Sequence, residues 1–256
     1  MTDGTRNWIV IPSRMGSSRF PGKPLAMING KTMLEWVVCN AVEAVGSRGT
    51  IVATCDDDIA REAERLGVRA VITSDLHERA TDRTAEAVAI LESEGLTFDS
   101  ILMLQGDEPT IPPKDLVTVL KRLSDDPAAE IVNLFSVIGS QEEWEDPNCV
   151  KVVANSDGSA AYFSRLPIPH GGNVNSGGAA KQVCAIGFRR GALKKFAAQA
   201  PGDLEKAESI DMLRWIEHGG EVHLEQSLTP THPVDVPEDI ALVEGLLKAA
   251  NYSPKV

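Results

Sequence analysis

The sequence predicts an α/β fold, in which parallel strands form a sheet that helices cover on both faces. Short apolar runs of strand length alternate in the first half of the chain with segments of helical periodicity, as in successive βαβ units. Glycine and proline end several of these segments, so their limits are well defined. With 256 residues, of which 43% are apolar, the chain is long enough for one large domain with a substantial core.

The first half contains the repeating strand–helix units. The expected strands are apolar runs at 7–12, 50–55, 68–73, 99–105 and 130–138. The expected helices lie at 31–46, 56–67, 84–94 and 114–124. The first helix ends at Gly46, and the second begins at Asp56, a residue type that caps helix N-termini, and ends at Gly67.

The second half departs from this pattern. Residues 149–165 read as two strands joined by a turn at Ser156–Gly158, and the glycine-rich stretch 167–182 predicts a loop. The further elements expected are a strand in AIGFRR, a helix in GALKKFAAQ, a helix at 205–219, a strand in VHLEQ and a closing helix at 237–250. No internal repeat or linker is evident, so we expect a single domain in which roughly 140–220 forms a subdomain.

Charge is unevenly distributed along the chain. There are 25 Lys and Arg against 37 Asp and Glu, a formal net charge of −12. This excess disfavours nucleic acid or an anionic membrane surface as a partner, because both bind extended basic faces. Residues 1–31 nevertheless carry five basic side chains and one acidic one. A small anionic ligand at this end is therefore compatible with the overall charge.

The four cysteines lie far apart and form no CxxC pair. This spacing argues against a structural zinc site or a disulfide framework and is typical of a reducing cytosol. No apolar run is long enough for a signal peptide or a transmembrane helix. We therefore expect a soluble, cytoplasmic protein.

The segment PSRMGSSRFPGKPL (12–25) follows the first expected strand and concentrates positive charge. It combines Arg14, Arg19 and Lys23 with a Gly-Ser-Ser stretch that allows close approach to the backbone. This combination predicts phosphate binding, although a solvated surface loop could have the same composition. Neither GxxxxGK[ST] nor GxGxxG follows the strand, so a P-loop ATPase or a nicotinamide dehydrogenase is not indicated.

Two acidic segments are candidates for holding a metal ion. In QGDEP (105–109), Gly106 permits a sharp exit from the strand, and Asp107 and Glu108 follow it. Asp235 lies in VDVPED (234–239). Mg²⁺ prefers one or two carboxylates together with phosphate oxygens and water. Capping of the helices that follow is the alternative role for these carboxylates.

A third polar segment, TSDLHERATDR (73–83), also follows a strand. Its mixed charges could be solvated, or its Thr-Asp-Arg cluster could bind a base edge or a ribose. The carboxyl ends of parallel strands meet at one edge of a sheet, where ligands bind in this class of fold. We therefore expect the basic segment, QGDEP and TSDLHERATDR to line one site.

Five segments, taken in order, resemble one protein family. SRMGSSRFPGKPL, ITSDLHERATDR, LQGDEPTIPP, EDPNCVKVVANSDGSAAYFSRLPIP and VDVPEDI closely resemble the CMP-Kdo synthetases (3-deoxy-manno-octulosonate cytidylyltransferases). The resemblance covers about residues 8–248, and its first and fourth segments are long and specific.

The resemblance implies a three-layer α/β/α, Rossmann-like nucleotidyltransferase fold with a mixed, mostly parallel sheet and a small dimerisation subdomain. In the single domain 1–256, residues 1–139 would be the nucleotide-binding half, about 140–220 the sugar-binding and dimerisation subdomain, and 221–256 the closing strand and helix. The implied reaction couples CTP to a 2-keto-3-deoxy sugar acid in the presence of Mg²⁺. Its products are a CMP-sugar, as used in lipopolysaccharide biosynthesis, and pyrophosphate. The family is commonly homodimeric.

The resemblance also implies roles for individual residues. Catalysis would depend on Arg14, Lys23, Asp107 and Asp235, of which Asp107 and Asp235 would hold Mg²⁺. CTP would be bound by Arg14, Ser17, Ser18, Arg19, Lys23, Thr73, Ser74, Asp82, Arg83 and Gln105. The sugar acid would be bound by Arg165, which would face its carboxylate, and by Gln182, Asp211 and Met212.

Three departures from the family's pattern involve four positions. Gln182 stands where a His is usual, Asp211 and Met212 replace a Glu-Gln pair, and Ala80 replaces the Gly before Thr-Asp-Arg. Losing polar groups that bond sugar hydroxyls costs on the order of 1–3 kcal/mol for each group left unpaired. Two substrates are compatible with these departures. One is Kdo, bound in an altered pocket, and the other is a related acid such as an amino-octulosonate or a nonulosonate.

Two other classes of function are less favoured. A catalytically inactive CTP sensor would not need the intact set Arg14, Lys23, Asp107 and Asp235. A related glycosyltransferase would need a DxD motif beside a donor-sugar pocket, whereas the acidic run 56–58 is expected to start a helix away from the sheet edge.

Overall fold

Strands and helices alternate along most of the chain. The strands are β1 (Asn7–Pro12), β2 (Met27–Ile28), β3 (Lys31–Thr32), β4 (Thr50–Thr54), β5 (Arg69–Ile72), β6 (Ser100–Leu104), β7 (Ile131–Val137), β8 (Lys151–Ala154), β9 (Ala160–Ser164), β10 (Ala180–Arg189) and β11 (Val222–Gln226). The helices are α1 (Met33–Val45), α2 (Asp57–Arg65), α3 (Ala80–Ser93), α4 (Pro113–Asp125), α5 (Gln141–Glu145), α6 (Arg190–Ala198), α7 (Asp203–Glu208), α8 (Met212–Glu217) and α9 (Asp239–Ala249), with 3-10 turns η1 (Lys23–Leu25) and η2 (Ser47–Gly49).

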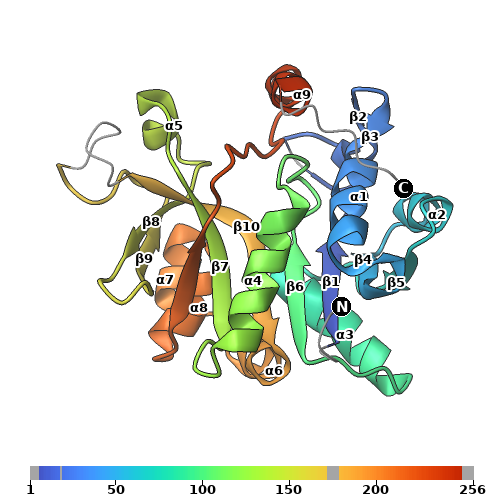
Figure 1. The fold of residues 1–256 in the computed structure, drawn as a ribbon, viewed down its shortest axis with the longest axis horizontal. Coiled ribbons are helices and arrows are strands. Elements are labelled where there is room, and N and C mark those ends of the chain that lie inside the picture. Colours follow the sequence, from blue (N-terminus) through green and yellow to red (C-terminus); the bar gives the residue numbers. More distant parts are fainter. Residues whose placement is uncertain (1–5, 18, 172–178, 250–256) are drawn as a thin grey trace.

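The computed structural model describes residues 6–17, 19–171 and 179–249, and in them nine strands form one mixed sheet (Figure 1). The main path through the sheet is β11-β7-β10-β6-β1-β4-β5. Neighbours on this path pair in parallel, except that β10 is antiparallel to both β6 and β7. The predicted α/β class and the mixed, mostly parallel sheet are therefore confirmed.

Helices cover both faces of the sheet, which gives three layers. On one face α1, α2 and α4 pack on Ile9 and Ile11 of β1 and on the matching residues of β4 and β6. On the other face α3, α6 and α8 pack on Val10 and its neighbours. Successive side chains of a strand point to opposite faces, so both faces bury apolar residues. This double burial explains why β1 has a continuous apolar sequence.

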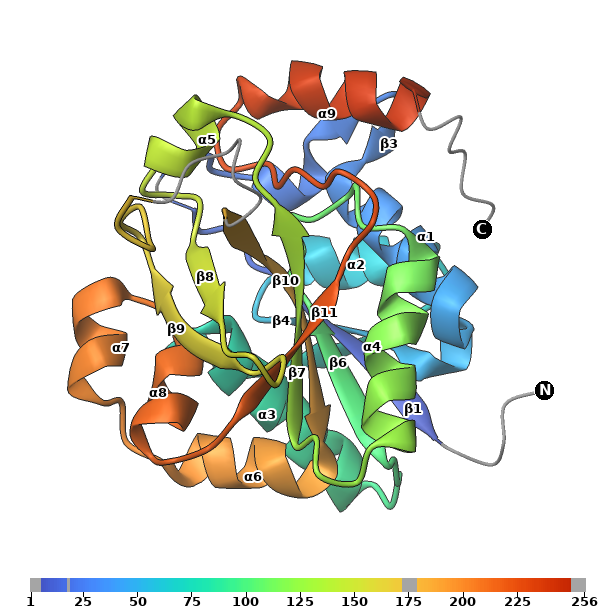
Figure 2. The ribbon, with the colours of Figure 1, turned by 60° about the vertical axis from the view of Figure 1, so that its left-hand side comes forward.

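The expected subdomain at about 140–220 shares the main sheet. β8 and β9 form a hairpin, and β8 also pairs with the first residues of β10 (Figure 2). β10 itself lies between β6 and β7 in the central sheet. The boundaries at 139 and 220 stay predictions, because the sheet is continuous across both.

The C-terminal helix α9 packs near the basic segment rather than on the main sheet (Figure 2). Val243 and Leu247 of α9, with Val234, form a small apolar cluster with Ile28, Met33 and Trp36. This contact brings residues 227–238, which link β11 to α9, across the carboxyl ends of the strands.

Two sequence predictions are wrong in detail. The helix expected at 205–219 is two short helices, because Ser209 adopts a left-handed conformation with φ 57° between α7 and α8. The loop expected at 167–182 ends earlier, since β10 begins at Ala180 and pairs there with β7 and β8. Residues 172–178 of that loop lie outside the described residues.

Among the described helices, none combines the length and the hydropathy that a membrane span requires.

Candidate functional site

A cleft of about 560 Å³ lies where the carboxyl ends of the parallel strands meet. Its walls come from four loops: the basic segment after β1, residues 77–80 after β5, QGDEP after β6, and residues 231–236 before α9. β10 and the segment from α5 to β8 close its other side. All three segments that the sequence predicted to share a site therefore do so.

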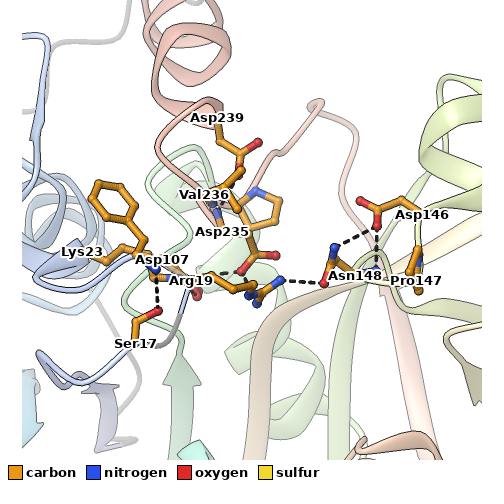
Figure 3. A network of polar contacts seen from close by, with 12 residues as sticks. Ser17, Arg19, Lys23, Asp107, Asp146, Pro147, Asn148, Asp235, Val236 and Asp239 are labelled. Atoms are coloured by element: carbon orange, nitrogen blue, oxygen red, sulfur yellow. Dashed lines mark hydrogen bonds and ion pairs between the residues drawn. The ribbon is translucent and has the colours of Figure 1, made fainter.

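The centre of the cleft is a network of cations and carboxylates (Figure 3). Lys23 Nζ lies 2.7 Å from Asp107 Oδ2 and 3.7 Å from Asp235 Oδ1. Arg19 contacts Asp235 at 2.8 Å and donates a second hydrogen bond of 2.6 Å to Asn148. Three chain segments more than 80 residues apart therefore meet at one ammonium group.

The negative charge of Asp107 is close enough to Asp235 to perturb it. Burial raises the pKa of Asp235, and the negative charge of Asp107 raises it further. Lys23 and Arg19 act in the opposite direction. Cations therefore stabilise the ionised pair, and the position between the two carboxylates favours positive charge.

The basic segment has a defined shape. Gly22 has a φ of 75°, and its N–H donates to the Met15 carbonyl, so the segment turns back on itself before η1. The Met15 N–H in turn donates to Asp56 Oδ2 at 2.8 Å. Sequence reasoning missed this role: Asp56 stands at the N-cap of α2 but makes no capping bond. The acidic run 56–58 was also expected to lie away from the sheet edge, which is wrong for Asp56.

The cleft depends on a close approach of two strand ends. A Cβ at Gly106 would lie 3.3 Å from the Pro12 carbonyl and 3.2 Å from Ser13 Oγ. Glycine at 106 therefore lets QGDEP lie against the end of β1, which brings Asp107 within reach of Lys23.

The neighbouring Glu108 is buried, and burial raises its pKa to about 8, assisted by the charge of Asp107.

The residues predicted to bind the nucleotide are only partly brought to the cleft. Arg14, Ser17, Arg19, Lys23, Arg83 and Gln105 line it. Thr73, Ser74 and Asp82 do not: Thr73 accepts a 2.6 Å bond from Arg83, and Asp82 pairs with Arg214 at 3.1 Å. Arg83 is buried, and its Nη2 has no hydrogen-bond partner among the described residues. Ser18 lies outside the described residues.

Of the residues predicted to bind the sugar acid, three line the cleft and one does not. Arg165, Gln182 and Asp211 line the cleft, and Gln182 donates a 2.6 Å bond to Asn133. Met212 does not reach it: this side chain is fully buried in the core beneath α3 and α6, because it opens α8 and points toward the sheet.

Two residues of the cleft were given no role by the sequence. Lys181 lies in β10, is buried, and bonds to Glu143 and to the Thr231 carbonyl. Arg79 lies within the singled-out segment TSDLHERATDR, but no role was assigned to it there, and in the structure it bonds to Ser209. Only the partners supplied by the fold reveal these positions.

Comparisons with known proteins agree on the kind of protein this chain is similar to. The profile of the family described as cytidylyltransferase matches residues 8–227. A Vibrio vulnificus (strain CMCP6) protein named 3-deoxy-manno-octulosonate cytidylyltransferase is 37% identical over 250 residues, covering 94% of this chain and 98% of that protein. An Escherichia coli protein of the same name is 36% identical over 239 residues, covering 93% and 95%.

Solved structures give the same result. A CMP:2-keto-3-deoxy-manno-octonic acid synthetase complexed with CTP has a TM-score of 0.85 and 35% identity, and the match covers 96% of this chain and all of that one. A 4-diphosphocytidyl-2C-methyl-D-erythritol synthase has a TM-score of 0.65 and 18% identity over 96% of this chain and 100% of its own. The second likeness shows the fold alone.

Proposed function

The chain belongs to the cytidylyltransferase family, and we propose that it transfers the cytidylyl group of CTP to a 2-keto-3-deoxy sugar acid, Kdo or a close relative. The observation that carries the proposal is the placement of Arg14, Arg19 and Lys23 in one cleft with Arg165 and Gln182. The three cations of the basic segment suit a triphosphate, and Arg165 with Gln182 suits a polar, anionic acceptor. The relatives named for this reaction match over nearly their whole length.

In the proposed reaction, a hydroxyl group of the sugar acid loses its proton to solvent, and its oxygen forms a bond to the α-phosphorus of CTP. The bond between that phosphorus and the bridging oxygen to the β-phosphorus breaks, and pyrophosphate leaves with the electron pair. Both reactants are anionic, so attack requires neutralisation of the phosphate charge. Lys23 and Arg19 supply it by exchanging their carboxylate partners for phosphate oxygens, and Arg14 adds a third cation from the same segment.

Mg²⁺ is part of the proposal, and the residues present fit it. Asp107 and Asp235 both lie near one ammonium group, and their mutual repulsion would be relieved by a divalent cation. The described residues contain no cluster of three or more His, Cys, Asp or Glu side chains placed to hold a metal. Two carboxylates completed by phosphate oxygens and water are the ligand set that Mg²⁺ prefers. When bound, the ion would supply charge neutralisation and polarisation of the phosphate.

The test of the proposed function is pyrophosphate release from CTP and Mg²⁺. Kdo, an amino-octulosonate and a nonulosonate would be compared as acceptors, and UTP and ATP as alternative nucleotides. We expect release that depends on both CTP and a sugar acid. CTP binding with no release for any acceptor would contradict the proposal and favour a sensor.

Substitution of a carboxylate tests the magnesium proposal. Asp107→Asn should raise the Mg²⁺ concentration needed for half-maximal activity by about tenfold or more, because it removes one of two anionic ligands. Asp58→Asn, at an exposed surface ion pair, is the control and should leave the titration unchanged. Identical Mg²⁺ titrations for Asp107→Asn and the wild type would place the metal elsewhere.

We also propose that the protein is a cytoplasmic homodimer. All four cysteines are unpaired, which suits a reducing compartment. Val137 at the end of β7 and Leu166 just after β9 are large apolar side chains exposed at 49% and 69%. β7, which carries Val137, is joined to β9, which Leu166 follows, by pairing through β10 and β8. Such exposed apolar groups support an interface there.

A further inference from the structure

Arg79 reaches across the cleft from the nucleotide-binding half to the break between α7 and α8. It is the residue before α3, and its Nη1 donates to Ser209 Oγ at 2.8 Å and to the Ser209 carbonyl at 3.3 Å. The two residues are 130 positions apart. Its side chain is about one-third exposed and belongs to the lining of the cleft.

Arg165, the residue expected to face the acceptor's carboxylate, is held by backbone carbonyls. Its Nε donates to Glu208 at 2.7 Å, its Nη1 to Pro147 at 2.9 Å and its Nη2 to Ser209 at 3.3 Å. These bonds fix the guanidinium against the end of α7. Arg165 and Arg79 therefore share the carbonyl oxygen of Ser209, and the two cations lie side by side.

The two acidic neighbours of Arg79, Glu205 and Asp211, each accept hydrogen bonds from another side chain, Arg214 and Thr81 respectively. The nearest acidic group is Glu205, whose Oε1 lies 3.9 Å from Arg79 Nε. That carboxylate is already committed to two 2.7 Å bonds with Arg214. Nη2 of Arg79 makes no hydrogen bond to the part of the chain that the structure describes. Two adjacent guanidinium groups with spare N–H donors are a site for a planar anion.

The position of Arg79 selects which anion it meets. The phosphate-binding cations Arg19 and Lys23 contact Asp235 and Asp107, whereas Arg79 is directed toward Ser209 on the side of Arg165 and Asp211. Arg14 of the basic segment reaches the His77 carbonyl at 3.3 Å, two residues before Arg79, so an acceptor held by Arg79 would lie next to the triphosphate, as the reaction requires. A sugar acid carries one carboxylate, which accepts two parallel hydrogen bonds from a guanidinium.

We propose that Arg79 binds the carboxylate of the acceptor sugar acid, and that Arg165 is a positioning residue that holds the Ser209 carbonyl and so orients Arg79. The inference rests on the proposed function and deepens it. It makes Arg79 a specificity-determining residue, which separates acids from neutral sugars of the same shape.

The test compares acceptor and nucleotide dependence in Arg79→Ala, Arg79→Lys and the wild type, with the best acceptor from the panel above and its C1 carboxamide. Pyrophosphate release gives KM and kcat, and calorimetric titration of the acid gives binding without turnover. In Arg79→Ala we expect the KM for the acid to rise about 10- to 100-fold, as for loss of hydrogen bonds to a charged group. The KM for CTP should stay within about twofold, and the preference for acid over amide should fall by the same factor as acid binding.

Two controls separate carboxylate binding from a structural role. Ser209→Ala removes the hydroxyl that Arg79 bonds but keeps the carbonyl and both arginines, so the preference for acid over amide should persist. Arg61→Ala removes an exposed surface arginine and should change nothing. Arg79→Lys retains the charge without the paired donors, so its KM for the acid should lie between those of the wild type and Arg79→Ala. If the alanine variant does not fold, Arg79→Lys replaces it in the comparison.

The outcomes distinguish this inference from the proposed function. Wild-type protein that releases no pyrophosphate with any acid overturns the proposed function itself. An active wild type whose acid–amide preference is unchanged in Arg79→Ala and Arg79→Lys overturns the role of Arg79 alone. The same holds if these variants raise the KM for CTP instead of that for the acid.

Discussion

At the scale of single residues, Lys23 joins the two halves of the candidate site. It is 12% exposed and contacts both Asp107 and Asp235. Lys23→Ala should lower the rate of pyrophosphate release by at least about 100-fold, because a preorganised cation on the phosphates is lost. Its structural contribution is small, since the surrounding segment is held by backbone bonds such as Gly22 to Met15.

Circular dichroism and thermal unfolding would accompany the kinetics. The control is Lys195→Ala, which removes a lysine from an exposed ion pair with Glu130 and should leave activity unchanged. Near-normal turnover by a folded Lys23→Ala protein would remove Lys23 from the proposed clamp.

Asp211 is the residue whose protonation should affect stability. Burial raises its pKa, and the main opposing contribution is the hydrogen bond that it accepts from Thr81; Arg79, Glu205 and Arg214 are its charged neighbours. Because the pKa is higher in the folded state, this group's contribution to stability is greatest below the unfolded pKa near 3.8 and is lost as pH rises through the folded value. The loss is about 1.4 kcal/mol for each unit of pKa difference.

Asp211→Asn should therefore become more stable relative to the wild type as pH rises above about 4. Free energies of unfolding from urea titrations between pH 4 and pH 7.5 would measure the difference. A wild type that instead gains on the variant with rising pH would mean that the ionised carboxylate is the favoured form.

At the scale of elements, the break between α7 and α8 is stabilised by a buried ion pair. Arg214 and Glu205 are 2% and 1% exposed, are joined by two 2.7 Å bonds, and the guanidinium also stacks over Phe196 at 4.5 Å. The third partner, Asp82, links this pair to α3. The pair holds Ser209, and with it the acceptor side of the cleft, in place.

Removing one member of the pair should be far more costly than removing both. Arg214→Met should lower the free energy of unfolding by about 3–5 kcal/mol, because it leaves the Glu205 carboxylate buried without its main partner. The double variant Arg214→Met, Glu205→Met should recover most of that loss, since it buries no unpaired charge. Chemical unfolding of both variants measures this; equal stabilities would show that the carboxylate is solvated or protonated.

The same region shows why element prediction succeeded elsewhere and failed here. Periodicity placed β1, α1 and α4 well, because each has an apolar face that is continuous in sequence and packs on one layer. Residues 205–219 also have helical periodicity, but Ser209 is in the left-handed region, and its carbonyl accepts bonds from Arg79 and Arg165. Those tertiary contacts override a local preference.

At the scale of the whole molecule, the proposed homodimer gives a prediction of assembly. Light scattering coupled to gel filtration should report about twice the mass of one chain. Leu166→Asp, at a 69% exposed apolar position, should shift the protein toward the monomer, because it places a charge in the proposed interface. Leu228→Asp, at an 81% exposed position after β11, is the matched control. A monomeric wild type would contradict the proposal.

The sequence by itself determined the α/β class, most strands and helices, and the three segments that share the cleft. These follow from hydrophobic periodicity, from short motifs and from the rule that parallel strands present their carboxyl ends at one edge. It also placed Arg19, Lys23, Asp107 and Asp235 together, through the family resemblance, and the structure brings these four into contact.

Only the tertiary structure decided which of the remaining candidate residues face the cleft. Asp82 pairs with Arg214 across 132 positions, Met212 lies in the core, and Arg79 meets Ser209 across 130. Likewise, β10 enters the sheet between β6 and β7, which come from well before it in the chain. The physical reason is that a side chain's partner depends on how distant elements pack, whereas a sequence pattern reports only the preferences of near neighbours.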